Sequence, residues 1–189
     1  MPVYDETNIE DLQSRLLDTE SQDLELDLGC GKSNLCHSLA GANPSVQYVG
    51  VDWNRHFCME GERGRRKYGI SNVFFVNLEA GLFLKKYVRS ASVRAVYIFF
   101  PSPAPRAQRL VTESFLWEVF RVLSVRGELR LITDDSDYYS SIRKSLRIVG
   151  WEEDFWVPFP FILPPGLLVG TPCEEEYGSH FVLCLRKRY

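Results

Sequence analysis

Hydrophobic and polar residues follow two patterns that alternate along the chain. Short, nearly continuous apolar runs are typical of strands that are covered on both faces of a parallel sheet. Longer stretches with apolar residues three or four positions apart are typical of amphipathic helices. The first pattern predicts strands at 24–28, 47–52, 73–76, 95–100, 128–133 and 181–186. The second pattern predicts helices at 5–18, 34–40, 55–68, 82–88, 112–123 and 138–149.

The regular alternation of strands and helices predicts an α/β fold with a doubly wound, mostly parallel sheet. We expect a single domain over residues 1–189, in which residues 1–20 contribute an N-terminal helix. The segment 151–178 breaks the alternation, because it is rich in aromatic residues and prolines between 155 and 165. We expect this segment to lie as irregular chain on the substrate side, at the edge of the sheet where such folds bind ligands.

Composition narrows the class of protein. The chain has 189 residues, 45% of them hydrophobic and 25% charged, which is ordinary for a globular domain with a substantial core. Its formal net charge of −3 argues against a globally basic nucleic-acid-binding protein and leaves room for a local basic patch. Neither a membrane-spanning stretch nor a secretion signal is visible, so we expect a cytoplasmic protein. The five cysteines lack metal-binding spacing, so we expect free thiols and no metal site.

A glycine-rich turn, Asp27-Leu28-Gly29-Cys30-Gly31, follows the first predicted strand and opens a helix. Glycines let the backbone approach a ligand closely, and the start of a helix offers free N–H groups. A P-loop is excluded because position 26 is Leu where that motif needs Gly. A dinucleotide-binding turn would have its third glycine where Asn34 stands. What remains is the [DE]-x-G-x-G turn that is typical of S-adenosylmethionine-dependent methyltransferases.

The second and third predicted strands also end in polar residues. Asp52 closes the second strand 21 residues after Gly31, where a carboxylate can accept hydrogen bonds from both hydroxyls of a ribose. Asp27, below the turn, can meet the amino group of the cofactor, and the residues after the third strand stand where adenine would lie. The predicted cofactor-binding residues are Asp27, Gly29, Cys30, Gly31, Asp52, Trp53, Asn77, Leu78, Glu79 and Phe100.

Several further motifs complete a known pattern. The most specific are Phe99-Phe100-Pro101-Ser102-Pro103-Ala104-Pro105-Arg106 and Thr171-Pro172-Cys173-Glu174, and others lie at 26–33, 49–52, 77–80 and 132–134. With these motifs, the sequence from about residue 24 to 189 resembles the bacterial tRNA (guanine-N7-)-methyltransferases. The resemblance implies a Rossmann-like class I methyltransferase with a seven-stranded sheet. It also implies S-adenosylmethionine as methyl donor, S-adenosylhomocysteine as product and no metal.

The resemblance further implies a substrate site formed by Pro101, Ser102, Asp134, Thr171 and Glu174, with Asp134 and Ser102 in catalytic roles. Carboxylates in such a site would stabilise the positive charge that a ring nitrogen gains on methylation. On the residues alone, Asp134 could also belong to a solvated turn that caps the next helix. Ser102 could equally be a turn residue between two prolines.

The sequence departs from this family where RNA would bind. Ser102 replaces an Asp, Ala104 replaces a Trp, and the family's basic run is reduced to residues 106–109, of which Arg106 and Arg109 are basic. Because phosphate contacts dominate affinity for nucleic acids, we expect an enzyme that N-methylates a small purine-like or other nitrogen heterocycle.

Two alternatives stay open. One is a tRNA guanine-N7 methyltransferase with a reduced basic loop, in which the basic cluster 63–67 joins Arg106 and Arg109 in a modest phosphate site. The other is a non-catalytic protein that binds the cofactor or a partner protein. We expect no membrane partner, and either a monomer or a homodimer.

Overall fold

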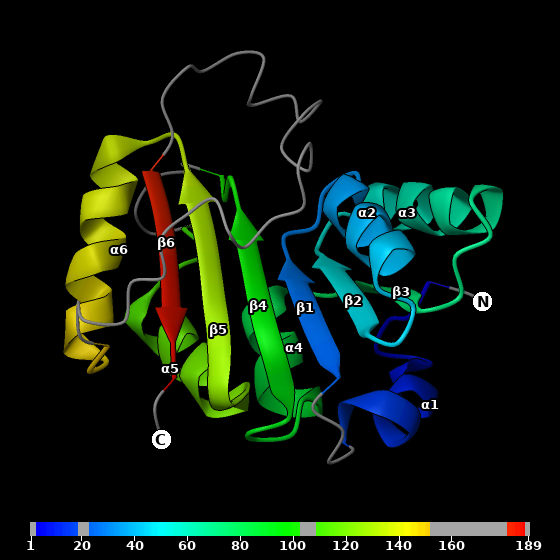
Figure 1. The fold of residues 1–189 in the computed structure, drawn as a ribbon, viewed down its shortest axis with the longest axis horizontal. Coiled ribbons are helices and arrows are strands. Elements are labelled where there is room, and N and C mark those ends of the chain that lie inside the picture. The colour runs from blue at the N-terminus through cyan, green and yellow to red at the C-terminus, as the bar shows by residue number, and fades with distance from the viewer. Residues whose placement is uncertain (1–2, 19–22, 103–108, 152–180, 188–189) are drawn as a thin grey trace.

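The computed structural model describes residues 3–18, 23–102, 109–151 and 181–187. They form a six-stranded sheet in the order β3-β2-β1-β4-β5-β6 (Figure 1). Neighbouring strands run parallel except for β6, which is antiparallel to β5. The strands are β1 (Leu24–Leu28), β2 (Gln47–Asp52), β3 (Val73–Asn77), β4 (Val93–Phe99), β5 (Leu123–Thr133) and β6 (Phe181–Arg186).

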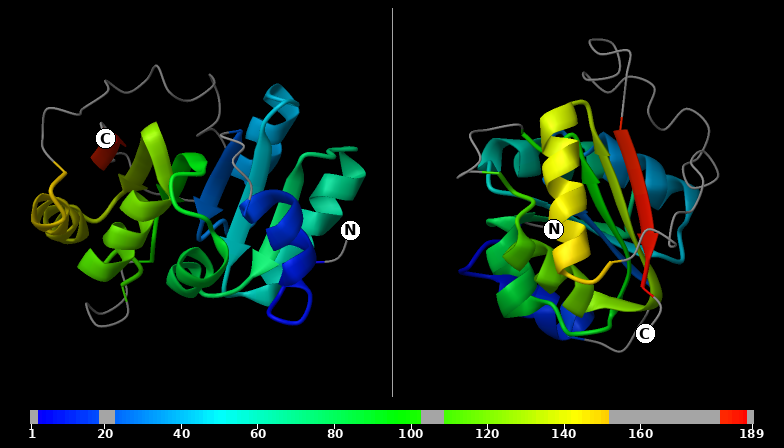
Figure 2. Two further views of the ribbon diagram at one scale, coloured as in Figure 1. Left: turned by 90° about the horizontal axis from the view of Figure 1, so that it is seen from below. Right: turned by 90° about the vertical axis from the view of Figure 1, so that its left-hand side faces the viewer.

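Helices cover both faces of the sheet. On one face, α2 (Asn34–Ala42) and α3 (Arg55–Lys67) pack over β2 and β3. The other face carries α4 (Ala80–Tyr87), α5 (Glu113–Val122) and α6 (Ser136–Ile148), as Figures 1 and 2 show. The short helix α1 (Ile9–Leu12) and the π-helical turn η1 (Gln13–Leu17) share the apolar core of that second face. Because both faces are covered, all five residues of β1 are buried.

The predicted doubly wound α/β fold is confirmed, with differences at the ends of elements. The predicted helix 5–18 is helical only from Ile9, because residues 5–8 form a turn in which the Asn8 N–H donates to the Asp5 carbonyl at 3.1 Å and the Asp5 N–H donates to Asn8 Oδ1 at 2.8 Å. Strand β5 begins at Leu123, inside the predicted helix 112–123, since it follows α5 without an intervening turn. The described residues hold six strands, so the expected seventh is not among them. Apart from Trp151, the predicted irregular segment 151–178 lies outside the described residues.

The carboxyl ends of the central strands lie level with one another. Leu28 at the end of β1 pairs with Val51, and Asp52 at the end of β2 pairs with Asn77 at the end of β3. The loops that follow these three strands therefore open at one edge of the sheet, beside the end of β4. This is the edge at which doubly wound folds bind their ligands.

Candidate active site

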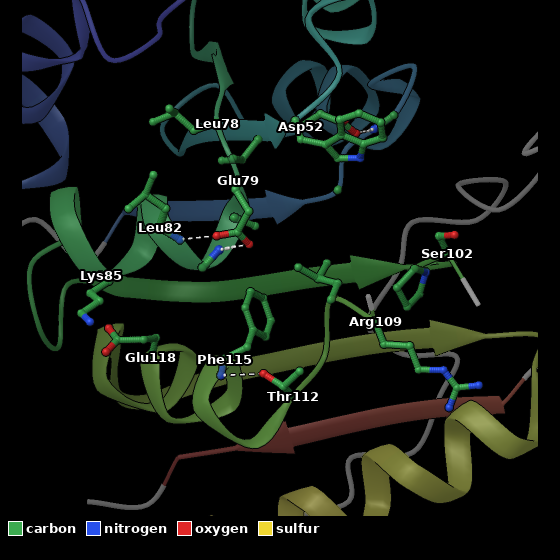
Figure 3. A pocket seen from close by; sticks show the side chains of 18 of the residues that line it. Asp52, Leu78, Glu79, Leu82, Lys85, Ser102, Arg109, Thr112, Phe115 and Glu118 are labelled. Atoms are coloured by element: carbon green, nitrogen blue, oxygen red, sulfur yellow. Dashed lines mark hydrogen bonds between the residues drawn. The ribbon is translucent and has the colours of Figure 1, made fainter. Parts of the chain in front are cut away.

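A cleft of about 930 Å³ opens at this edge of the sheet (Figure 3). It extends from the glycine turn after β1, past the loops after β2 and β3, to side chains of α4 and α5. Its volume lies in the range of cofactor and small-molecule sites. The predicted site residues that line it are Gly29, Gly31, Asp52, Trp53, Leu78, Glu79, Phe100, Pro101 and Ser102.

The glycine turn is held against the end of β2. The backbone N–H groups of Gly29 and Cys30 both donate to the carbonyl of Val51, at 2.8 and 3.1 Å. Gly29 and Gly31 adopt φ angles of +82° and +49°, a conformation that glycine adopts at little cost. A Cβ atom on Gly31 would meet no atom of the described residues within 4 Å. The turn therefore presents main chain, rather than side chains, to the cleft.

Asp52 joins the loop after β2 to the glycine turn. Its Oδ2 accepts a hydrogen bond from the Gly31 N–H at 2.9 Å, and its Oδ1 accepts one from the Asn54 N–H at 2.8 Å. The side chain is buried, yet it lines the cleft. Each carboxylate oxygen can accept more than one hydrogen bond. Asp52 can therefore hold the turn and still accept hydrogen bonds from a ligand.

Asp27 lies behind the turn and does not line the cleft. It is 5% exposed, and the thiol of Cys36 donates to its Oδ2 at 3.3 Å. Burial raises the pKa of this carboxyl group to about 7, since water no longer stabilises the charged form. Cys30 is also buried outside the cleft lining, with its Sγ atom 3.8 Å from the hydroxyl of Ser33.

The residues after β3 divide between the cleft and the loops around it. Leu78 and Glu79 line the cleft. The Glu79 carboxylate caps α4 by accepting the N–H groups of Gly81 and Leu82 at 2.8 and 2.7 Å. Asn77 does not line the cleft, because its Nδ2 donates to main-chain carbonyls in the loop after β2.

The segment after β4 forms the other end of the cleft. The Phe100 N–H donates to the Ile132 carbonyl at 2.8 Å, and Phe100 has a φ of +50°, which is strained for a residue with a side chain. Asp134 follows β5 but does not line the cleft, and the adjacent Asp135 caps α6. Thr171 and Glu174 lie outside the described residues.

Sequence reasoning missed the wall that α4 and α5 contribute. Leu82 and Lys85 on α4 and Phe115 and Glu118 on α5 line the cleft, and the side chain of Lys85 points toward that of Glu118 (Figure 3). Both helices were predicted, but which of their residues reach the cleft depends on how they pack. Arg109 also lines the cleft, and its guanidinium lies 4.5 Å from the centre of the Tyr138 ring.

Two arginines of the basic cluster predicted at 63–67 form ion pairs within α3 itself. Arg65 and Arg66 both form ion pairs with the carboxylate of Glu62. Neither arginine lines the cleft. Arg106, the other expected member of a phosphate site, lies outside the described residues.

Comparison with known proteins places the chain in a family. Residues 21–150 match the family model Methyltransf_4, described as "Putative methyltransferase". The chain belongs to this methyltransferase family. The match covers most of the elements that surround the cleft, from β1 to α6.

Two curated proteins that are similar to this chain are both named tRNA (guanine-N(7)-)-methyltransferase. The tRNA (guanine-N(7)-)-methyltransferase of Rubrobacter xylanophilus is 35% identical over 135 residues, which are 68% of this chain and 59% of that protein. The protein of the same name from Chloroherpeton thalassium is 32% identical over 125 residues, which are 64% of this chain and 55% of that protein. The matched part of the chain therefore spans less than two thirds of the length of these relatives.

The fold is also found among solved structures. A SAM-dependent O-methyltransferase from Thermotoga maritima superposes with a TM-score of 0.61 over 97% of this chain and 66% of that chain, at 15% identity. This likeness supports the Rossmann-like architecture. Within the described parts of the chain, no group of three or more His, Cys, Asp or Glu residues is arranged to hold a metal ion. No helix in those parts is long and apolar enough to cross a membrane.

Proposed function

We propose that the protein is an S-adenosylmethionine-dependent methyltransferase that modifies guanine N7 in tRNA. The cofactor assignment rests on one observation, which is that the glycine turn, fixed by Asp52, lies at the edge of a cleft of about 930 Å³. The substrate assignment draws on the similarity to curated tRNA (guanine-N(7)-)-methyltransferases. A tRNA substrate would place the protein in the cytoplasm.

The residues of the cleft fit S-adenosylmethionine. The open space at Gly31 admits a ligand against the main chain, and Asp52 offers acceptor oxygens for a ribose. Trp53, Phe57 and Leu78 provide apolar surface for an adenine ring. When bound, this cofactor supplies a methyl group on a positively charged sulfonium, which the acidic side chains of the cleft would favour.

Methylation of guanine N7 does not require a general base. The nitrogen already carries a lone pair in the plane of the ring, so no side chain has to remove a proton. The contribution of the chain is alignment and charge stabilisation. We assign Phe100 and Pro101 to the walls of the base site, with the hydroxyl of Ser102 beside them. Asp134, Thr171 and Glu174 are proposed to contact the edge of the base.

The charge of the cleft favours a second candidate, a small nitrogen heterocycle. Among the described residues that line the cleft, the cations are Lys85 and Arg109, against the acids Asp52, Glu79 and Glu118. A site built for the RNA backbone is expected to carry an excess of cations. A small, uncharged heterocycle would need none. A non-catalytic role would fit a cleft filled by side chains, whereas the described residues leave this cleft open.

Methylation assays with the purified full chain separate these candidates. Labelled S-adenosylmethionine is incubated with tRNA transcripts that lack modifications and, in parallel, with free purines and related heterocycles. We expect label in tRNA, recovered as 7-methylguanine by mass spectrometry after hydrolysis. Asp52→Ala should abolish it, whereas Glu10→Gln, on the exposed surface of α1, should not. Label in free heterocycles but not in tRNA would establish the second candidate instead. Label in neither, with cofactor binding intact, would overturn both.

A further inference from the structure

We propose that Asn77 is a positioning residue, whose side-chain amide fixes the loop after β2 so that Trp53 and Asp52 face the bound cofactor. The inference rests on the proposed function, because it assumes that this loop meets S-adenosylmethionine. It assigns Asn77 a role that acts through other residues, in place of the direct adenine contact that the sequence suggested.

The hydrogen bonds of Asn77 point into the protein. Its Nδ2 donates to the carbonyl of Asp52 at 3.1 Å and to the carbonyl of Trp53 at 2.9 Å. A primary amide has two N–H donors, so these two bonds use the full donor capacity of the side chain. The backbone N–H of Asn77 is also engaged, by the Tyr4 carbonyl at 2.7 Å. Asn77 therefore has no N–H left to donate to a ligand.

The Asn77 amide is part of a series of hydrogen bonds that links the ends of β3, β2 and β1. Asn77, at the end of β3, holds the two carbonyls after β2. The Asp52 carboxylate in turn accepts the N–H groups of Gly31 and Asn54. The position of the loop after β2 is thereby transmitted to the glycine turn. Removing the amide would leave the bonds from Asp52 to Gly31 and Asn54 in place, but the loop after β2 would lose its side-chain support from the end of β3.

Trp53 depends on the amide more than Asp52 does. The carbonyl of Asp52 accepts a second, weaker hydrogen bond from the thiol of Cys58 at 3.5 Å. The Trp53 side chain is 79% exposed, so packing does little to fix its ring. Asn77 holds the main-chain carbonyl of Trp53 and thereby the place from which the ring extends toward the cleft. We therefore expect the loss of the amide to act mainly on the contact between Trp53 and the cofactor.

Asn72 provides a matched control at the opposite end of β3. Its Nδ2 lies 3.2, 3.1 and 2.7 Å from the carbonyl oxygens of Ala40, Asn43 and Val46, which share its two N–H donors. Asn72 thus fastens main chain as Asn77 does, and it is buried, but it does not line the cleft. An effect that arises only from weaker folding should appear in Asn72→Ala as well.

Calorimetric titration with S-adenosylhomocysteine tests the role without relying on turnover. We expect Asn77→Ala to raise the Kd about tenfold, the size expected for the loss of one or two hydrogen bonds. Asn72→Ala should lower the melting temperature but leave the Kd within about twofold. In a Trp53→Ala background, the effect of Asn77→Ala should shrink to about threefold or less, because the two changes then act on the same contact. Asn77→Ser serves as a milder variant if Asn77→Ala does not fold.

The outcomes are distinguishable. The role of Asn77 is overturned if Asn77→Ala binds S-adenosylhomocysteine as tightly as the wild type, or if Asn72→Ala weakens binding equally. It is also overturned if the effects of Asn77→Ala and Trp53→Ala simply add, since this would indicate a direct and independent contact. A wild-type protein that binds neither S-adenosylmethionine nor its product overturns the proposed function itself, and the role of Asn77 with it.

Discussion

The buried carboxyl group of Asp27 keeps its proton in the folded protein, so the stability of the protein should fall as the pH rises from about 4 toward 7. The side chain is 5% exposed, and burial raises its pKa from 3.8 to about 7, despite the opposing hydrogen bond from the Cys36 thiol. In the unfolded chain the same group ionises near pH 3.8. Between these values the folded protein binds one proton more than the unfolded chain. Its free energy of unfolding therefore falls as the pH rises through this window.

The size of the effect follows from the shift. Each pH unit by which the pKa is raised corresponds to about 1.4 kcal/mol, so a rise of about three units is worth about 4 kcal/mol. The loss is complete above about pH 7 and absent below about pH 4. Asp27→Asn cannot ionise, and its side-chain oxygen can still accept a hydrogen bond from Cys36. The variant should therefore gain stability relative to the wild type across this range.

Urea unfolding, followed by circular dichroism, measures the difference. From pH 5 to pH 8, we expect the free energy of unfolding of Asp27→Asn to rise relative to the wild type by about 3 kcal/mol. Cys36→Ala removes the hydrogen bond that lowers the pKa of Asp27, so it should move the upper end of the transition to higher pH. Parallel curves for the wild type and Asp27→Asn from pH 5 to pH 8 would show that Asp27 is ionised in the folded protein, and would refute the reasoning.

Three further substitutions test the packing around the site, each by urea unfolding. Gly61→Ala should cost about 1–3 kcal/mol, because its Cβ would lie 2.5 Å from the hydroxyl oxygen of Ser33, whereas Gly41→Ala, with no described atom within 4 Å, should be neutral or stabilising. Tyr138→Phe should cost about 1–3 kcal/mol, since it leaves the Val111 N–H, now bonded at 2.8 Å, without its acceptor. Burial raises the pKa of Glu62, but two arginines of α3 outweigh burial and lower it to about 2. The stability lost in Glu62→Gln should therefore be largest above pH 4.5 and shrink as the pH falls toward 2.

Each of these expectations has a clear contrary result. A Gly61→Ala variant as stable as Gly41→Ala would mean that α3 can move away from the glycine turn without cost. An unchanged stability in Tyr138→Phe would mean that water replaces the hydroxyl. A stability difference between Glu62→Gln and the wild type that stays constant from pH 5 to pH 2.5 would contradict the lowered pKa.

The sequence predicts a feature well when the residues that determine it lie close together along the chain. The glycine turn and Asp52 could be predicted because they stand at fixed places, at the ends of two parallel strands that share one register. The sequence could not decide a feature for which two structures fit the same residues. The apolar spacing of 112–123 continues past the end of α5, so the pattern could not show that Leu123 already belongs to β5.

The environment of individual side chains was less predictable, because it depends on residues far apart in the sequence. Glu25 stands in the middle of a buried strand, where a carboxylate is costly unless it is paired. Its partners are Arg94 and the hydroxyl of Tyr97, about seventy positions away. In the same way, nothing in the sequence near Asn77 indicates that its amide meets the carbonyls after β2.

Contacts between residues far apart in the sequence explain how the glycine turn, which is flexible in the free chain, is held in one conformation. Two glycines and Ser33 in the turn all have positive φ, a conformation that the free chain has little reason to hold. Asp52 holds the turn from β2, and Gly61 lets α3 approach it closely. A ligand that binds a turn already fixed in this way does not spend binding energy on ordering it. A substitution that loosens a support outside the cleft, such as Gly61→Ala, should therefore weaken binding even though the replaced atoms do not touch the ligand.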